Sequence, residues 1–142
     1  MQFVCSVNSK VVSALDAVTG KIEAGGDFRS FNNNWEPREL DALGIADEVG
    51  LRKGLCAWHL IEGKRVKDNT GLIQAGLIII DIDNQADGKD EKGNKVQKQE
   101  LTWEQAQELD VCKKYLSVAY DSPSTTESWP RFRLVFGLEK PI

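Results

Sequence analysis

The run of four consecutive aliphatic residues at 77–80 (Leu-Ile-Ile-Ile) constrains the fold more than any other part of this 142-residue chain. Gly76 precedes the run and Asp81-Ile82-Asp83 follows it. A short apolar run rich in β-branched residues predicts a strand covered on both faces, as in the centre of an α/β sheet. The run is far shorter than the roughly 20 residues of a membrane-spanning helix. We therefore expect a buried central strand that ends in two aspartates.

The composition is that of a soluble globular protein with enough apolar material for one packed core. Hydrophobic residues make up 41% of the chain and charged residues 28%. The net charge of −4 argues against non-specific coating of nucleic acid but leaves room for a local basic patch. Met1-Gln2-Phe3 has neither the basic start nor the cleavage site of a signal peptide. We therefore expect a cytoplasmic protein with no membrane partner.

The cysteine and histidine residues indicate neither a disulfide framework nor a metal site. Cys5, Cys56 and Cys112 are odd in number and about fifty residues apart, which favours small buried hydrophobic side chains. His59 is the single histidine of the chain, so a His-rich metal site is excluded.

In the first half of the chain the periodicity predicts one helix and one strand. Residues 1–35 give no clear element, although the segment from Phe3 to Val12 contains several β-branched residues. From Pro37 apolar residues follow at helical spacing: Leu40, Leu43, Ala46 and Val49. We expect this helix to end at Gly50 or Gly54 and a buried strand to follow at residues 55–61.

In the second half the pattern is loop, helix, strand, loop and strand. Residues 84–99 are polar and rich in lysine, which predicts an exposed loop. A helix follows Leu101, with Thr102 and Gln105 at capping-box spacing. Strands are expected at residues 115–120 and 131–136, on either side of a loop at 121–130. This order of elements predicts an α+β fold with a mixed central sheet and flanking helices.

Asp81 and Asp83 are the first candidate functional residues. Side chains two apart on a strand point to the same face, so the two carboxylates project together and repel each other unless a cation lies between them. Mg²⁺ and Mn²⁺ prefer such hard oxygen ligands, with substrate phosphates completing the shell. The alternative is a strand that simply ends in a polar loop.

The segment from Asp121 to Phe136 is the second candidate region. Its hydroxyl-rich loop, residues 121–130, could hold phosphate oxygens with side-chain and backbone donors. Arg131 and Arg133 alternate with Phe132, so both are expected on one face of a strand, where guanidinium groups can bind phosphate in a bidentate manner. The alternative is an edge strand with solvated charges on its outer face.

Taken in order, these motifs resemble those of the archaeo-eukaryotic primase superfamily, in particular the primase-polymerase domains of plasmid and phage replication proteins. The resemblance covers roughly residues 35–142. It depends on Gly63-Lys64-Arg65, on the strand ending Asp-Ile-Asp, on a following helix, and on Tyr120-x-Ser-Pro-Ser-x-Thr-x-x-x-Pro-Arg-Phe-Arg-Leu-Val-Phe136. It implies a single domain with an RRM-like core, in which 1–35 is an N-terminal extension and 36–142 the motif-bearing core.

The resemblance also implies residue roles. Asp81 and Asp83 would be the catalytic, metal-binding pair for Mg²⁺ or Mn²⁺. Nucleotide-binding roles are implied for Ser124, Thr125, Arg131, Arg133, Lys64 and Arg65. Thr125 stands where the family has histidine, a departure that bears on polymerase activity. The family also has a third acidic residue on a later strand, so we expect these residues to be the front part of a longer catalytic domain, incomplete at its C-terminal side.

The function implied is a DNA primase or polymerase, a nucleotidyltransferase domain of a mobile-element replication protein. Its partners would be nucleoside triphosphates, a single-stranded DNA template and a helicase in the same chain or complex. Trp35, Trp58 and Trp129 are candidates for base stacking, although core packing is the commoner role of tryptophan. Two alternatives remain open: a non-catalytic DNA-binding or scaffolding module of the same fold, and a metal-dependent phosphohydrolase using the Asp-x-Asp strand.

Overall fold

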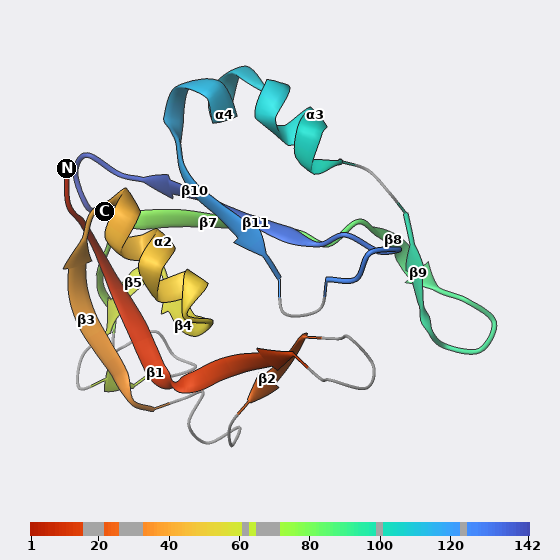
Figure 1. The fold of residues 1–142 in the computed structure, drawn as a ribbon, viewed down its shortest axis with the longest axis horizontal. Coiled ribbons are helices and arrows are strands. Elements are labelled where there is room, and N and C mark those ends of the chain that lie inside the picture. The colour runs from red at the N-terminus through yellow and green to blue at the C-terminus, as the bar shows by residue number, and fades with distance from the viewer. Residues whose placement is uncertain (16–21, 26–32, 61–62, 65–71, 99–100, 123–124) are drawn as a thin grey trace.

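Two antiparallel sheets and three short helices make up most of the computed structural model, which describes residues 1–15, 22–25, 33–60, 63–64, 72–98, 101–122 and 125–142 (Figure 1). The fold is mixed α+β, as the order of elements predicted. Among the described residues, none of the helices is both long and apolar enough to cross a bilayer.

The first sheet is built on one long strand, β1 (Phe3–Leu15). It pairs antiparallel with β2 (Ile22–Gly25), β3 (Trp35–Leu40) and β4 (Lys53–Cys56). The β-branched residues seen between Phe3 and Val12 therefore do mark a strand. Its side chains Phe3, Cys5 and Val7 are buried.

Helix α2 (Ala42–Gly50) follows β3 and begins later than the periodicity predicted. The Asp41 side chain caps it by accepting from the Gly44 backbone N–H at 2.8 Å, and Ile45 is fully buried. The expected helix start at Pro37 is wrong, because Pro37 lies within β3 opposite Ser6. Among the described strands β3 pairs only with β1, and an edge strand tolerates the missing N–H of proline.

The second sheet consists of β7 (Leu77–Ile82), β10 (Leu116–Asp121) and β11 (Phe132–Gly137), in the order β10-β11-β7. All three strands were expected from the sequence. β11 lies in the centre and pairs antiparallel with both neighbours. Gly76 leads into β7 where the two sheets approach closely, and a β-carbon there would collide with the backbone of Val4.

The expectation that β7 is covered on both faces is wrong. Leu77 is buried, but Ile78 and Ile80 are 45% and 43% exposed. They line an apolar groove of about 440 Å³ together with residues of the neighbouring helix and strand. Among the described strands β7 lies at the edge of its sheet, because β11 takes the central place.

Two hydrophobic cores flank the second sheet. The first lies between the two sheets and α2, and contains Phe3, Cys5, Ile45, Leu77 and Val135. The second lies under the C-terminal helices, and contains Ala106, Cys112, Phe132, Leu134 and Phe136. Alternate residues of β11 therefore point into different cores, which fixes the face to which Arg133 belongs.

The helix expected after Leu101 is present as two short helices, α3 (Trp103–Glu108) and α4 (Asp110–Tyr115). The predicted capping box is confirmed: Thr102 Oγ1 accepts from Gln105 N at 3.1 Å and Gln105 Oε1 accepts from Thr102 N at 2.9 Å. The expected continuous helix is interrupted at Leu109, whose backbone is extended.

The remaining strands form two small hairpins. The strand expected at residues 55–61 is divided at Ala57, so that β4 joins the first sheet and β5 (Trp58–Leu60) pairs with β6 (Leu72–Ala75). The exposed loop expected at 84–99 contains a hairpin of β8 (Gln85–Lys89) and β9 (Lys95–Gln97). Asp90 and the left-handed Gly93 form its turn, since Asp90 Oδ1 accepts from two backbone N–H groups.

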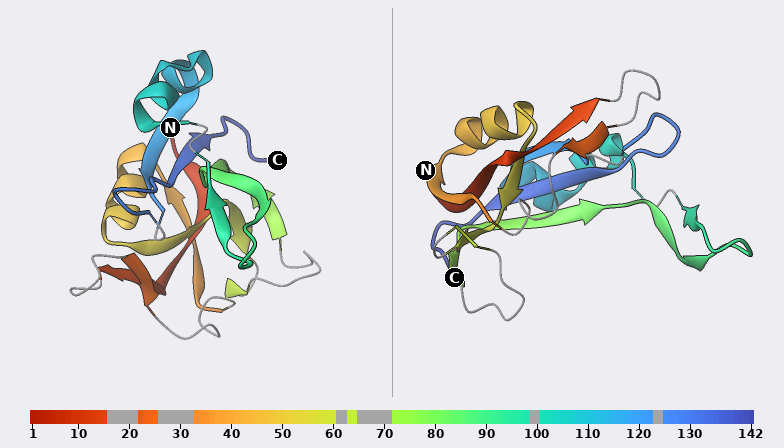
Figure 2. Two further views of the ribbon diagram at one scale, coloured as in Figure 1. Left: turned by 90° about the vertical axis from the view of Figure 1, so that its right-hand side faces the viewer. Right: turned by 90° about the horizontal axis from the view of Figure 1, so that it is seen from below.

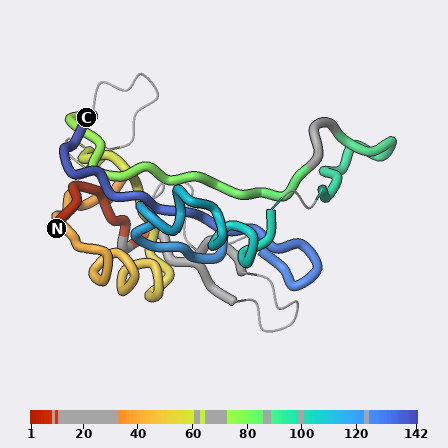
Figure 3. The backbone as a smooth tube through the Cα atoms, turned by 90° about the horizontal axis from the view of Figure 1, so that it is seen from above, coloured from red at the N-terminus to blue at the C-terminus, as the bar shows by residue number. Residues whose placement is uncertain are grey.

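The β8–β9 hairpin projects from one end of the molecule as a continuation of β7 (Figures 2 and 3). None of the three cysteines forms a disulfide; Cys5 and Cys112 are buried, as their spacing predicted, whereas Cys56 is half-buried. The chain termini lie near each other at the opposite end from the hairpin (Figure 1).

Candidate functional site

The two aspartates lie at the end of β7 nearest the hairpin. Asp81 is the penultimate residue of the strand and Asp83 follows its last residue; both are exposed. Strand alternation directs the Asp81 side chain to the face that carries the first core nearer the start of β7. Asp83 lies beyond the strand, so the shared face of the two carboxylates stays a prediction.

Asp81 forms an ion pair with Arg133, through the carboxylate Oδ1 and the guanidinium Nε. The register of the sheet causes this contact, because Arg133 lies directly opposite Asp81 on β11. On the other side of β11, Tyr120 of β10 lies opposite Arg133, whose Cζ is 5.8 Å from the tyrosine ring centroid. Tyr120, Arg133 and Asp81 therefore form one row across three strands.

The electrostatics of this row keep Arg133 charged and Tyr120 neutral. Burial is the largest single effect on the Arg133 guanidinium and lowers its pKa, but the hydrogen bonds and charge interactions with Asp81 and Tyr120 together outweigh burial and the pKa is raised. Burial raises the pKa of Tyr120, against a smaller opposite effect of Arg133. A carboxylate paired with such a permanent cation is already neutralised before any other cation arrives.

The loop after β10 is fastened to the end of β7. Trp129 Nε1 donates to the backbone carbonyls of Asp83 and Asn84, at 3.0 and 2.9 Å. The guanidinium of Arg131 lies over the Trp129 ring, with Cζ 4.0 Å from the ring centroid. Arg131 and Arg133 were expected on one strand face, but they contact different partners, because β11 begins only at Phe132. Both nevertheless lie near the aspartate end of β7.

Thr125, which the resemblance to primases aligns with a histidine, has a structural contact in the same loop. Its Oγ1 accepts a hydrogen bond from the Arg131 backbone N–H at 2.9 Å, and its own N–H donates to Ser122 O at 2.9 Å. The threonine hydroxyl thus helps to close the loop at the point where the chain enters β11. Ser124, the other expected phosphate contact in this loop, lies outside the described residues.

Asn84 holds this end of the molecule together, and the motif reading did not single it out. It is 3% exposed and has a left-handed backbone, with φ of 46°. Its Nδ2 donates to the carbonyls of Leu101 and Pro130, each at 2.9 Å, and its Oδ1 accepts from Leu101 N at 3.0 Å. Asparagine tolerates positive φ better than most residues. An asparagine directly after Asp-x-Asp was therefore the sequence signal that could have indicated a left-handed residue at the end of the strand.

Lys64 lies in a different part of the molecule from the aspartates. It lines a depression of about 410 Å³ with residues of β1, β3 and the turns beside them: Lys10, Asn33, Asn34, Trp35, Glu36 and Gly63. None of these residues belongs to β7 or β11. Arg65, the neighbouring basic residue of the expected motif, lies outside the described residues.

The three tryptophans named as possible base-stacking residues differ in burial. Trp35 is 3% exposed and belongs to the core, whereas Trp129 is half-buried under Arg131. Trp58 is 38% exposed. Trp103, which the sequence pattern placed only in a helix, is equally exposed and lines a pocket.

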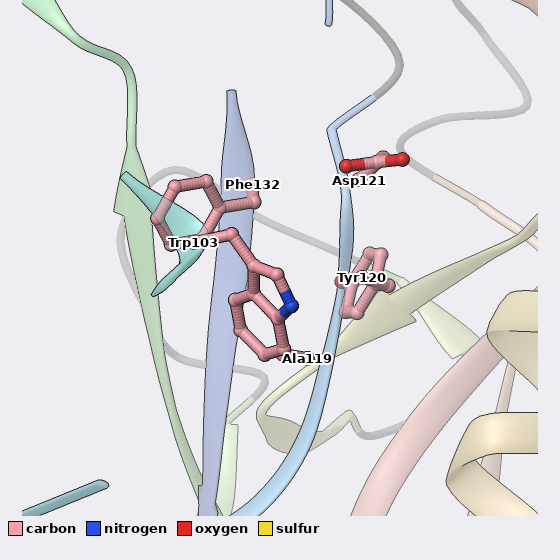
Figure 4. Close-up of a pocket in the computed structure, with 5 residues that line it drawn as sticks. All are labelled: Trp103, Ala119, Tyr120, Asp121 and Phe132. Atoms are coloured by element: carbon pink, nitrogen blue, oxygen red, sulfur yellow. The ribbon is translucent and has the colours of Figure 1, made fainter. Parts of the chain in front are cut away.

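A pocket with a volume of about 300 Å³ includes Trp103 and Phe132, which belong to the helix-covered face of the second sheet, opposite the charged row. It is lined by Trp103, Ala119, Tyr120, Asp121 and Phe132 (Figure 4). Trp103 contacts Phe132 edge to face, with ring centroids 5.8 Å apart. Tyr120 belongs to both the pocket and the charged row.

The donor set at the end of β7 fits a divalent cation that takes most of its ligands from elsewhere. In the part of the chain that the structure describes, three or more His, Cys, Asp or Glu side chains do not gather at any point. Mg²⁺ is commonly bound by one or two carboxylates with water and substrate phosphates, and Asp81 and Asp83 can supply that share. Comparisons with protein-family models, curated proteins and solved structures found no match for this chain.

Proposed function

We propose that this chain is a nucleoside-triphosphate-binding domain of the primase-polymerase type, a DNA-dependent nucleotidyltransferase domain of a mobile-element replication protein. The observation that carries the proposal is the ion pair of the Asp81 carboxylate with Arg133 on the neighbouring strand, with Asp83 two residues further along the chain. One end of one sheet thus offers ligands for both a cation and an anion. A metal-bound triphosphate has both charges.

The proposal includes the finer fold, an RRM-like core. It is supported by an antiparallel sheet, β10-β11-β7, that carries two helices on one face and its charged row on the other. Single-stranded DNA and a helicase in the same chain or complex are the partners that the proposal adds.

Each residue has a separate task in this proposal. Asp81 and Asp83 hold Mg²⁺ or Mn²⁺, and Arg133 and Arg131 bind phosphate oxygens. When bound, the metal ions would neutralise charge that develops on the phosphates during in-line displacement. Arg133, already charged and positioned by β11, needs no proton transfer to take part.

In this proposal, the ion pair of Asp81 with Arg133 is present before nucleotide binds. A triphosphate competes with Asp81 for the guanidinium, and a cation competes with Arg133 for the carboxylate. Binding of the triphosphate to Arg133 frees Asp81 for the metal, and binding of the metal to Asp81 frees Arg133 for the triphosphate. Metal and nucleotide should therefore bind more tightly together than separately.

Calorimetric titration of a nucleoside triphosphate tests the proposal, with Mg²⁺ or Mn²⁺ and again with EDTA. We expect binding only with metal, and at least about tenfold weaker binding for the Asp81→Asn, Asp83→Asn double variant. Asp47→Asn is the matched control, because Asp47 is an exposed aspartate on α2. Equal binding by the double variant and the wild type would contradict the assignment.

A non-catalytic DNA-binding module is the second candidate. It is favoured by two contacts already described: Arg133 neutralises Asp81, and the Thr125 hydroxyl is engaged by the Arg131 backbone. Binding of a labelled single-stranded oligonucleotide in EDTA, without metal-dependent nucleotide binding, would favour this candidate. Release of phosphate from a simple monoester would instead favour the phosphohydrolase.

A further inference from the structure

We infer that Trp129 is a positioning residue, which holds Arg131 away from Asp83 and so leaves the Asp83 carboxylate open to a divalent cation. The inference rests on the proposed function, because it assigns unequal parts to the two aspartates proposed as metal ligands. Asp83 contacts the cation before nucleotide binds, and Asp81 joins it when a triphosphate draws Arg133 away. The sequence pattern named Trp129 only as a candidate for base stacking.

The carboxylates of Asp81 and Asp83 differ in their partners. Asp81 is paired with Arg133, its neighbour across the sheet. Asp83 is exposed, and no hydrogen bond or ion pair engages its carboxylate within the described part of the chain. A carboxylate that already has a guanidinium partner must give it up to bind a metal, whereas an unpaired carboxylate need not. Asp83 is therefore the more readily available ligand for Mg²⁺ or Mn²⁺ in the absence of nucleotide.

The register of the second sheet would by itself give Asp83 an arginine partner too. The pairs of β7 with β11 end at Ile82 and Phe132, so the next residues in the same register are Asp83 and Arg131. Backbone pairing with the end of β10 continues to Arg131, whose carbonyl accepts from Ser122 N at 2.9 Å. An arginine opposite a carboxylate ordinarily pairs with it. A separate contact must therefore hold the Arg131 guanidinium elsewhere.

Trp129 supplies this contact. The Arg131 guanidinium lies over the indole ring, with Cζ 4.0 Å from the ring centroid, and tryptophan is the aromatic residue that attracts a cation most strongly. The indole is itself fixed in place, since its Nε1 donates to the carbonyls of Asp83 and Asn84 at 3.0 and 2.9 Å. Thr126 exchanges two backbone hydrogen bonds with Trp129, each of 3.1 Å. One ring thus fastens the backbone of Asp83 and holds the arginine that would otherwise pair with its carboxylate.

Mn²⁺ binding without nucleotide, followed by electron paramagnetic resonance, tests the unequal parts of the two aspartates. We expect Asp83→Asn to weaken Mn²⁺ binding about fivefold or more, and Asp81→Asn to change it by less than about twofold. Equal effects of the two substitutions would contradict the open carboxylate at Asp83.

The part of Trp129 is tested by a second substitution that reverses the first. Trp129→Leu removes the ring, so Arg131 can pair with Asp83 and Mn²⁺ binding is expected to weaken about fivefold. The Trp129→Leu, Arg131→Met double variant is expected to regain wild-type affinity, because the competing cation is gone. A loss caused only by disturbance of the loop would not be restored by removing the arginine.

Trp129→Phe separates the stacking from the indole hydrogen bonds, since phenylalanine keeps an aromatic face and has no N–H donor. We expect its affinity for Mn²⁺ to stay within about twofold of wild type. Trp58→Leu is the matched control, because Trp58 is 38% exposed and pairs with Ala75, at the opposite end of β7 from Asp83. The control is expected to leave Mn²⁺ binding unchanged.

Two results with the variants would overturn the inference: weaker Mn²⁺ binding by Trp129→Leu that Arg131→Met does not restore, or equal weakening by Trp129→Phe. A wild-type protein that binds metal and triphosphate together but no Mn²⁺ alone would also overturn it, while the proposed function stands. The expected Mn²⁺ pattern without any binding of triphosphate would support the inference and contradict the proposed function. A wild-type protein that binds neither would contradict both.

Discussion

Asn84 and Arg133 show how single side chains organise the end of β7. Asn84 joins the end of the strand to Leu101 and Pro130 through three hydrogen bonds, and Trp129 bonds to the carbonyl of the same residue. Arg133 joins β11 to β7 through Asp81. Asn84 is buried and connects backbone segments, whereas Arg133 is half-buried and supplies the positive charge.

Replacing Asn84 by alanine is expected to lower the free energy of unfolding by about 3 kcal/mol, because three buried hydrogen bonds are lost and alanine is strained at positive φ. Urea unfolding followed by circular dichroism measures the change. Asn94→Ala is the control, since Asn94 lies exposed in the hairpin turn. Equal stability of the two variants would show that Asn84 does not fasten these segments.

Replacing Arg133 by methionine is expected to have opposite effects on the two proposed ligands. Without its partner, Asp81 should bind Mn²⁺ several-fold more tightly in the absence of nucleotide, because an ion pair of this exposure is worth about 1 kcal/mol. Triphosphate binding should weaken. Manganese binding followed by electron paramagnetic resonance measures the first effect and calorimetry the second.

Arg38→Met is the control for this experiment, because Arg38 also pairs with a carboxylate, Glu36, but on the first sheet. The control is expected to leave both affinities unchanged. Weaker manganese binding by Arg133→Met would contradict competition between the arginine and the metal.

At the scale of the element, local sequence patterns predicted where the strands of the second sheet lie. They did not predict which strands pair with one another. β7, β10 and β11 were expected because β-branched and aromatic runs are a local signal. The capping box at Thr102 was expected for the same reason. That β11 lies between the other two depends on pairing across about fifty residues, which no local pattern contains. The contact of Arg133 with Asp81 follows from that pairing and was therefore not predictable.

The elements that were predicted wrongly have local physical causes. Leu40, Leu43, Ala46 and Val49 have helical spacing, but pairing with β1 outweighs it for residues 35–40. The polar composition of residues 84–99 hid a hairpin, because β9 is solvated and the pairing of β8 with β9 depends on the turn at Asp90 and Gly93. Composition predicts exposure better than it predicts backbone pairing.

Cys5, on the core strand β1, is expected to make the stability of the protein depend on pH. Burial raises the pKa of the Cys5 thiol from 9.0 to about 12, with smaller contributions from Cys56 and Glu48. The folded protein therefore holds the neutral thiol more strongly than the unfolded chain does. This contribution to stability is complete below pH 9 and is lost as pH rises through that range toward 12.

The stability difference between wild type and Cys5→Ala should accordingly narrow from pH 7 to about pH 10, as measured by urea unfolding. Iodoacetamide at neutral pH should modify the half-buried Cys56 before Cys5, as peptide mass spectrometry would show. Faster modification of Cys5 would contradict its burial in the first core.

In the whole molecule, the proposed site and the chain termini lie at opposite ends of the second sheet (Figure 1). The backbone of Ala75 pairs with Ile142 through two hydrogen bonds, of 2.7 and 3.0 Å, just before β7 begins. β7 then runs the length of the sheet to Asp81 and Asp83, near the β8–β9 hairpin (Figure 1). The first core supports one face of this sheet and the second core supports the other.

The apolar groove beside β7 affects how this protein's unfolding should be followed. Ile78, Ile80, Val111 and Tyr115 remain 43–57% exposed in the folded state. Environment-sensitive dyes such as anilinonaphthalene sulfonate fluoresce on apolar surface of this kind, which most folded proteins hide. In a dye-based melting assay such a dye would report the groove as well as denaturation. Backbone circular dichroism, which does not respond to the groove, is therefore the suitable signal for comparing the variants above.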